Sequence, residues 1–148
     1  PILSTGAASL DLAKKAISTI AQAVSIPVCL HACGNISHII DEFLKMPVQI
    51  LDFEGSVNAA NLASFSGKEL QNRYIGYGIV DSSSPVLESL EDVKKRLWAG
   101  IDILGPERIL PDPDCGLRMH TPDSAYAKLS RLTTAVSEVR HDLNLGKI

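Results

Sequence analysis

The segment Leu30-His31-Ala32-Cys33-Gly34 contains two side chains that could bind one metal ion together. His31 and Cys33 are two positions apart, so both side chains point to the same side if the segment ends a β-strand. An imidazole nitrogen and a thiolate sulfur are ligands that Zn²⁺ prefers in proteins. We therefore interpret the pair as part of a candidate zinc site.

Two further candidate ligands follow later apolar runs of the chain. Glu54 comes directly after residues 49–53, and Cys115 comes directly after residues 108–114. Taken singly, each has an ordinary interpretation, because a thiol is often part of a core and a loop carboxylate is often solvated. Taken together, ligands at the ends of successive strand-like runs predict one shared site. Cys29 lies deeper in its run, and we expect it to be a core thiol.

The rest of the chain alternates between helical and strand-like patterns. Apolar residues spaced three and four apart predict amphipathic helices, whereas short apolar runs between Pro, Gly or polar residues predict buried strands. Ser9, Ser89 and Thr121 are typical helix N-caps, and Pro122 suits a first helical position. The expected helices cover residues 9–24, 36–46, 57–65, 89–104 and 121–140, and the expected strands cover residues 28–30, 48–53, 73–80 and 108–110.

This alternation predicts an α/β fold with a parallel sheet and right-handed crossovers. In such a sheet the loops that follow the strands gather at one edge, where sites are built. The four candidate ligands and the loop residue Asp81 all lie on that side. Asp112 and Asp114 precede the last ligand, and we interpret them as helix-side caps or as acceptors that hold a ligand in place.

Composition narrows the class of protein. The 148 residues are 45% hydrophobic and 21% charged, with a formal net charge of −3, which is typical of one globular domain. The chain has no strongly basic run, so we expect no nucleic-acid partner. It also has no apolar run of the roughly 18 residues that a membrane span requires. Three cysteines are an odd number for a disulfide framework and favour a reducing cytoplasm.

The segment Pro111-Asp112-Pro113-Asp114-Cys115-Gly116-Leu117-Arg118 resembles a motif of the C-terminal catalytic region of cobalamin-independent methionine synthase. It is most similar to the short archaeal-type homologues of that family. The resemblance implies that Cys115 is a zinc ligand. It also identifies His31 and Cys33 with the family's His-x-Cys pair, and Glu54 with its glutamate ligand.

The resemblance implies a fold and an activity. The family's (β/α)₈ barrel has roughly twice as many βα units as this chain supplies, so we expect residues 1–148 to be one catalytic domain, the C-terminal half of a barrel and a fragment of a longer chain. The implied reaction is zinc-dependent transfer of a methyl group to the thiolate of homocysteine. Alternatives are transfer to another thiol such as coenzyme M, or a half barrel that binds zinc without catalysis. A half barrel is expected to form a homo-oligomer or to pair with its missing half.

Two segments bear on the methyl donor and on substrate binding. Family members that use folate donors have an Asp-Ile-His-Ser-Pro loop, and here residues 81–85 read Asp-Ser-Ser-Ser-Pro. Ser83 stands where that histidine is found, which favours a methyl-corrinoid over a methyl-folate donor and makes Asp81 and Ser83 the candidate catalytic residues. Residues 1–4 resemble the end of the family's Asp-Glu-Pro-Ala-Leu motif, so residues that hold the amino acid are expected to precede residue 1.

Overall fold

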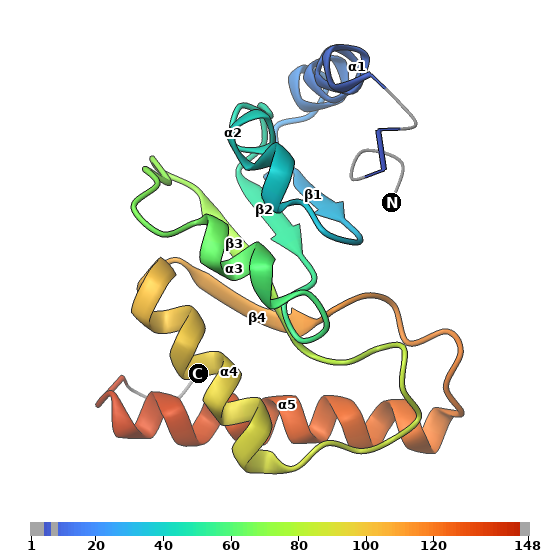
Figure 1. Cartoon of the computed structure of the whole chain (residues 1–148), viewed down its shortest axis with the longest axis vertical. Helices are drawn as coiled ribbons and strands as arrows, with labels where there is room; N and C mark the ends of the chain where they lie inside the picture. The colour runs from blue at the N-terminus through green and yellow to red at the C-terminus, as the bar shows by residue number, and fades with distance from the viewer. Residues whose placement is uncertain (1–4, 7–8, 146–148) are drawn as a thin grey trace.

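The computed structural model describes residues 5–6 and 9–145, and it contains one parallel four-stranded sheet. The strands lie side by side in the order in which they occur along the chain (Figure 1). The predicted α/β fold with four parallel strands is therefore confirmed, whereas residues 1–4 lie outside the described part. The strands are β1 (Cys29–Ala32), β2 (Ile50–Phe53), β3 (Tyr74–Val80) and β4 (Ile109–Pro113).

Helices connect the strands, as the sequence predicts. Ser89 and Thr121 cap two of them by accepting hydrogen bonds from backbone N–H groups of the first turn. The helix expected over residues 36–46 is wrong in detail, because it divides into the 3₁₀ turn η1 (Ser37–Ile39) and a single α-turn. Ile39, the last residue of η1 and the N-cap of the α-turn, has φ −118° and ψ 13°, outside the helical region. The helices are α1 (Leu10–Gln22), α2 (Ile40–Phe43), α3 (Ala59–Ser64), α4 (Leu90–Leu104) and α5 (Pro122–Asp142).

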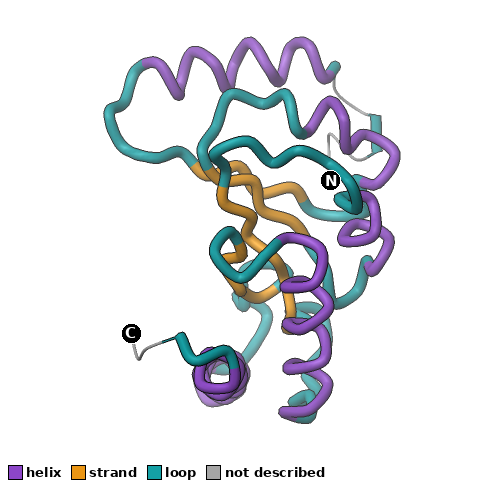
Figure 2. The backbone as a smooth tube through the Cα atoms, turned by 90° about the vertical axis from the view of Figure 1, so that its left-hand side faces the viewer, coloured by secondary structure: helices purple, strands orange, loops and turns teal. Residues whose placement is uncertain are grey.

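The two faces of the sheet differ in burial. One face carries large apolar side chains that helices cover, and Phe53 on this face stacks on Phe65 with ring centroids 4.8 Å apart. Figure 2 shows helices along one side of the strands, with a further helix across the top and another at the lower left. On the other face Tyr74 and Leu110 are exposed. Cys29 is on this second face and is also exposed, so the expectation that it is a core thiol is wrong, because no layer of the described chain covers it.

The sheet has two free edges in the described part of the chain. Strand β1 pairs only with β2, and β4 pairs only with β3. Helix α1, beside the first edge, has no buried residue. A cavity of about 1210 Å³ lies between the second edge and α5, lined partly by Leu110, Leu132 and Val136. No helix within residues 5–6 and 9–145 combines the length and the apolar character that crossing a bilayer requires.

Candidate metal centre

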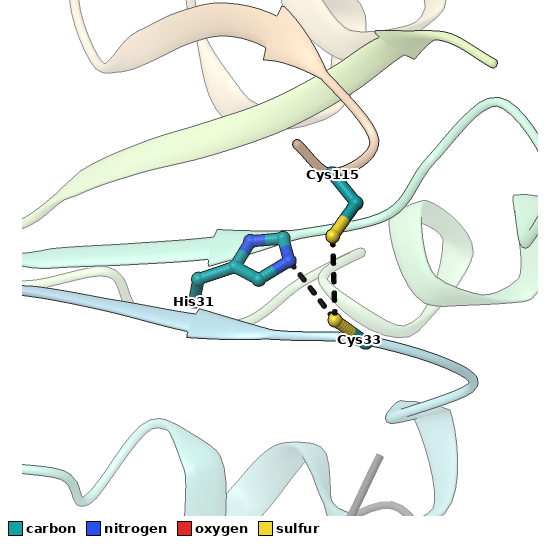
Figure 3. A group of neighbouring side chains, drawn as sticks. All are labelled: His31, Cys33 and Cys115. Atoms are coloured by element: carbon teal, nitrogen blue, oxygen red, sulfur yellow. Dashed lines mark hydrogen bonds between the residues drawn. The ribbon is translucent and has the colours of Figure 1, made fainter. Parts of the chain in front are cut away.

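Three of the four predicted metal ligands meet at the carboxyl ends of the strands. The Sγ atom of Cys33 lies 3.2 Å from Nε2 of His31 and 3.8 Å from Sγ of Cys115. The three ligand atoms lie within 4.8 Å of one another, and the side chains point toward a common centre (Figure 3). We call these residues the thiol cluster. The cluster joins the end of β1 to the residues after β4, which are 82 positions apart.

Asp52 holds the histidine of the thiol cluster. Its Oδ2 atom lies 2.7 Å from Nδ1 of His31, because the two residues are register partners on β1 and β2. A carboxylate that accepts a hydrogen bond from Nδ1–H keeps the proton of the neutral ring on Nδ1. The lone pair of Nε2 is then free for a metal. Asp52 was not predicted as a site residue from the sequence. A single carboxylate within the apolar run of β2 does indicate a polar partner on a neighbouring element, because an unpaired buried carboxylate is costly.

Glycine on β3 makes room for this carboxylate. Gly76 is the register partner of Asp52, and a Cβ added to Gly76 would lie 2.7 Å from Cβ of Asp52. That distance is too short for two carbon atoms, so any larger residue would displace the carboxylate that orients His31.

Hydrogen bonds, burial and neighbouring charges shift the pKa values of the three residues of the thiol cluster. The hydrogen bond from Asp52 raises the pKa of His31 to about 9, against the opposing effect of burial. Burial and the neighbouring Cys115 raise the pKa of Cys33 to about 11. Burial acts to raise the pKa of Cys115 as well, but hydrogen bonds from Gly116, Cys33 and His31 outweigh it and lower that pKa. Without metal, Cys115 is therefore the favoured thiolate, beside a protonated His31 and a protonated Cys33.

Glu54 does not join the thiol cluster. Its Oε2 atom accepts a hydrogen bond of 2.7 Å from Nδ2 of Asn58, which turns the carboxylate toward the start of α3. It remains close enough for its charge to contribute to the raised pKa of Cys33, after the larger effects of burial and Cys115.

Asp114 connects the loop of Cys115 to the loop of Glu54. It is 2% exposed. Its Oδ1 atom accepts hydrogen bonds of 2.9 Å from the N–H groups of Gly55 and Ser56, and its Oδ2 accepts from the N–H of Val57 and from the Ser56 hydroxyl. The side chain thus holds the loop that precedes α3. It neither caps that helix, whose N-cap is Asn58, nor binds a ligand side chain in these hydrogen bonds, so the predicted roles of Asp114 are wrong in detail.

Asp112 lies beside Asp52 rather than beside a ligand. Burial and the charge of Asp52 raise the pKa of Asp112 to about 8. The buried Oδ1 atoms of both carboxyl groups have no hydrogen-bond partner among the described residues. A protonated Asp112 therefore lowers the negative charge next to the carboxylate that holds His31.

Asp81 and Ser83 bind each other in the loop after β3. The Oδ1 atom of Asp81 accepts from the N–H and the hydroxyl of Ser83, at 2.7 and 2.6 Å. Burial acts to raise the pKa of Asp81, but these hydrogen bonds, with Ser84 and Lys128, lower it. His120 is half-buried, and its Nε2 atom lies 2.9 Å from the carbonyl oxygen of Ser82 in the same loop.

The thiol cluster suits zinc by its chemistry. One imidazole nitrogen and two thiolates are a common zinc donor set, and three protein ligands leave a fourth position for a substrate. The carboxylate on Nδ1 is the usual partner of a zinc-binding histidine. Hard cations such as Mg²⁺ prefer oxygen ligands, so the two sulfur atoms disfavour them.

Comparison with known proteins gives one consistent family. The family model described as "Cobalamin-independent synthase, Catalytic domain" matches residues 6–138. The chain is 38% identical over 138 residues to a protein named methionine synthase from Methanothermobacter marburgensis, covering 93% of this chain and 45% of that protein. It is 37% identical over 149 residues to the methionine synthase of Methanocaldococcus jannaschii, covering 95% of this chain and 47% of the relative.

A solved structure shares the fold at lower identity. It is a B12-independent methionine synthase from Shewanella sp. W3-18-1 in complex with selenomethionine, with a TM-score of 0.72 and 17% identity. The match covers 90% of this chain and 43% of that one. The chain therefore spans less than half the length of these relatives.

Proposed function

This chain belongs to the cobalamin-independent synthase catalytic-domain family, and we propose that it forms the zinc-binding, thiol-activating part of a methionine synthase. The observation that carries the proposal is the thiol cluster of His31, Cys33 and Cys115, whose ligand atoms lie within 4.8 Å of one another. The proposed reaction transfers a methyl group to the sulfur of homocysteine.

The residues of the cluster have distinct proposed roles. Zinc bound by them would be a Lewis acid that lowers the pKa of an acceptor thiol, which makes the sulfur nucleophilic at neutral pH. Asp52 accepts a hydrogen bond from Nδ1–H of His31, which keeps that proton on the ring and fixes the plane of the imidazole. Asp114 fixes the loop of Cys115. Glu54, bound by Asn58, would be a fourth ligand only after its side chain turns, which makes it the ligand that an incoming thiol replaces most easily.

The loop after β3 is proposed to face the methyl donor. Asp81 and Ser83 form its polar turn, and Ser83 is an exposed residue. A serine hydroxyl does not titrate near pH 7, so it suits a donor whose leaving group needs no proton. A methyl-corrinoid is such a donor, since its cobalt leaves with the electron pair, and we favour it over a methyl-folate.

The sheet is proposed to be completed by further βα units. Residues 1–148 would then be one domain of a longer barrel, or half of a barrel made from two copies. Both edges of the described sheet are free, and the cavity beside β4 is lined partly by apolar side chains. Sedimentation of the chain tests this point, because a stable monomer without a partner would contradict it.

Metal content is the first test of the proposed function. Elemental analysis after gel filtration should give about one zinc per chain, and the Cys115→Ala variant should lose it. Methyl transfer from methylcobalamin to homocysteine is then assayed beside coenzyme M as the competing acceptor. Zinc-free, folded, reduced protein would contradict the proposed site. Bound zinc with transfer to neither thiol would favour a non-catalytic zinc-binding half barrel.

A further inference from the structure

Buried polar side chains in the described part of the chain are few, and all of them bind loops at the carboxyl ends of strands. They are Asn61, Asp114 and Lys128, with exposed fractions of 0%, 2% and 1%. Lys128 donates to two carbonyl oxygens of the loop after β3. Asn61 binds the turn that follows Cys33, and Asp114, which precedes Cys115, binds the loop after β2. Burying a polar group is costly unless its partners are satisfied, so such placement fixes the partners firmly.

Asn61 lies on α3 and binds the segments that follow β1 and β2 at once. Its Nδ2 atom donates to the carbonyl oxygen of Gly34 at 2.9 Å and to that of Glu54 at 2.8 Å. Its Oδ1 atom accepts from the N–H of Ile36 at 2.8 Å. The amide therefore joins the turn that follows Cys33 to the end of β2.

Asn61 and Asp114 together form a continuous connection around the cluster. Asn61 links the turn after Cys33 to the carbonyl of Glu54, and Asp114 links the next residue, Gly55, to the loop of Cys115. The two sulfur atoms come from opposite edges of the sheet, and no strand pairing joins β1 to β4. Their separation of 3.8 Å therefore depends on contacts between loops.

We propose that Asn61 is a positioning residue for the metal centre, which sets the separation of Cys33 from Cys115 by joining their loops through the end of β2. The inference rests on the proposed zinc site, and it adds a residue outside the metal-ligand motifs. Asn61 contacts no ligand side chain in its three hydrogen bonds; it acts through the backbone of Gly34 and Glu54.

Metal affinity distinguishes this role from a purely structural one. Titration of the full chain with Co²⁺, followed by the sulfur-to-cobalt charge-transfer absorption, measures both affinity and the number of thiolate ligands. We expect Asn61→Ala to bind Co²⁺ about 10–100-fold more weakly than wild type, the usual effect of losing a group that orients ligands. The charge-transfer intensity per bound ion should also fall, because one thiolate no longer reaches the metal.

A matched control variant lowers the stability of the fold but keeps the hydrogen bonds of Asn61 to the loops. Leu62→Ala, on the same helix, creates a cavity in the core but deletes no hydrogen bond to the ligand loops. While folded, it should bind Co²⁺ as wild type does. If Asn61→Ala does not fold, Asn61→Asp is used, since it keeps the size and the acceptor for Ile36 and removes the two donated hydrogen bonds. The inference would be overturned if the folded Asn61 variant bound Co²⁺ as tightly as wild type does. It would also be overturned if Leu62→Ala lost as much Co²⁺ affinity as the Asn61 variant.

A metal-free probe separates this inference from the proposed zinc site. Phenylarsine oxide condenses with two nearby thiols, forming two As–S bonds and releasing one water, so its affinity reports the separation of Cys33 from Cys115. Wild type and Leu62→Ala should bind it tightly, and the Asn61 variant should bind it at least tenfold more weakly. Equal arsenical affinity in all three proteins would overturn the positioning role. Absence of Co²⁺ binding by wild type, with the arsenical difference intact, would contradict the zinc site alone.

Discussion

Replacing Asp52 with asparagine should change how metal affinity depends on pH. In wild type the carboxylate raises the pKa of His31 to about 9, so at pH 7 only about one ring in a hundred is neutral and able to bind metal through Nε2. The amide oxygen of the Asp52→Asn variant would still accept the Nδ1–H hydrogen bond, but without the negative charge. The pKa of His31 should then return toward its ordinary value of 6.5.

The expected size of the effect follows from counting protons. Between pH 7 and 9 metal must displace one proton from His31 and one from Cys33, whose pKa is about 11, so log affinity should rise by about two per pH unit from these groups. In Asp52→Asn only Cys33 still releases its proton in this range, and the slope should be smaller by about one.

Two opposing effects determine the affinity at each pH. Loss of the carboxylate weakens metal binding about 10–100-fold, whereas removal of proton competition at His31 strengthens it about 100-fold at pH 7 and about twofold at pH 9. The variant should therefore bind metal about 5–50-fold more weakly than wild type at pH 9, and between equally and about tenfold more tightly at pH 7.

Zn²⁺ competition with a chromophoric chelator at three pH values measures the slopes, and NMR titration of His31 measures its pKa directly. Asp41→Asn, which removes an exposed carboxylate bound to Lys68, is the matched control for net charge and should keep the wild-type slope. Equal slopes in wild type and Asp52→Asn would refute the role of Asp52 and the assignment of His31 as a ligand.

Four shorter predictions concern the scaffold around the cluster. Gly76→Ala places a Cβ 2.7 Å from Cβ of Asp52, so unfolding in urea should show a loss of about 1–3 kcal/mol, together with weaker Co²⁺ binding. Lys128→Met leaves two loop carbonyls without a donor and should cost about 1–3 kcal/mol in the same assay, with Co²⁺ affinity unchanged. Removal of bound zinc by a chelator should lower the Tm in calorimetry, because the ion binds the folded state; an unchanged Tm would mean that no ion was bound. In metal-free protein the stabilisation from the raised pKa of His31 should be complete below pH 6.5 and lost as pH rises through about 9, which unfolding at a series of pH values can check.

Strand parity and strand ends were enough to predict three members of the site. His31, Cys33 and Cys115 were predictable because alternation along a strand and the shared edge of a parallel sheet are properties of the backbone. Asp52 was not assigned, because its partner depends on the register between β1 and β2, which no local pattern specifies. Asn61 was missed for a similar reason, since its three partners come from two distant loops.

The remaining differences arise where the chain leaves regular structure. Glu54 follows the end of β2, where alternation no longer fixes the direction of a side chain, and Asn58 determines it instead. Cys29 lies two positions before His31 on β1, on the same face of the sheet, and its burial depends on whether another layer covers that face. The helix over residues 36–46 matched an apolar spacing, yet the backbone of Ile36 and Ile39 lies outside the helical region. The N–H of Ile36 donates to the side chain of Asn61, a tertiary partner that no local pattern specifies.

The separation of 82 residues between Cys33 and Cys115 has a consequence for how the protein opens. A ligand set drawn from the end of β1 and the residues after β4 exists only while every strand between them is in place. Fraying of the last strand alone would remove one thiolate, so metal release should accompany local opening of the C-terminal third rather than global unfolding. A bound ion would therefore slow hydrogen exchange in β4 and in the Asp114 loop first, and its dissociation rate would report how often that part of the chain detaches from the sheet.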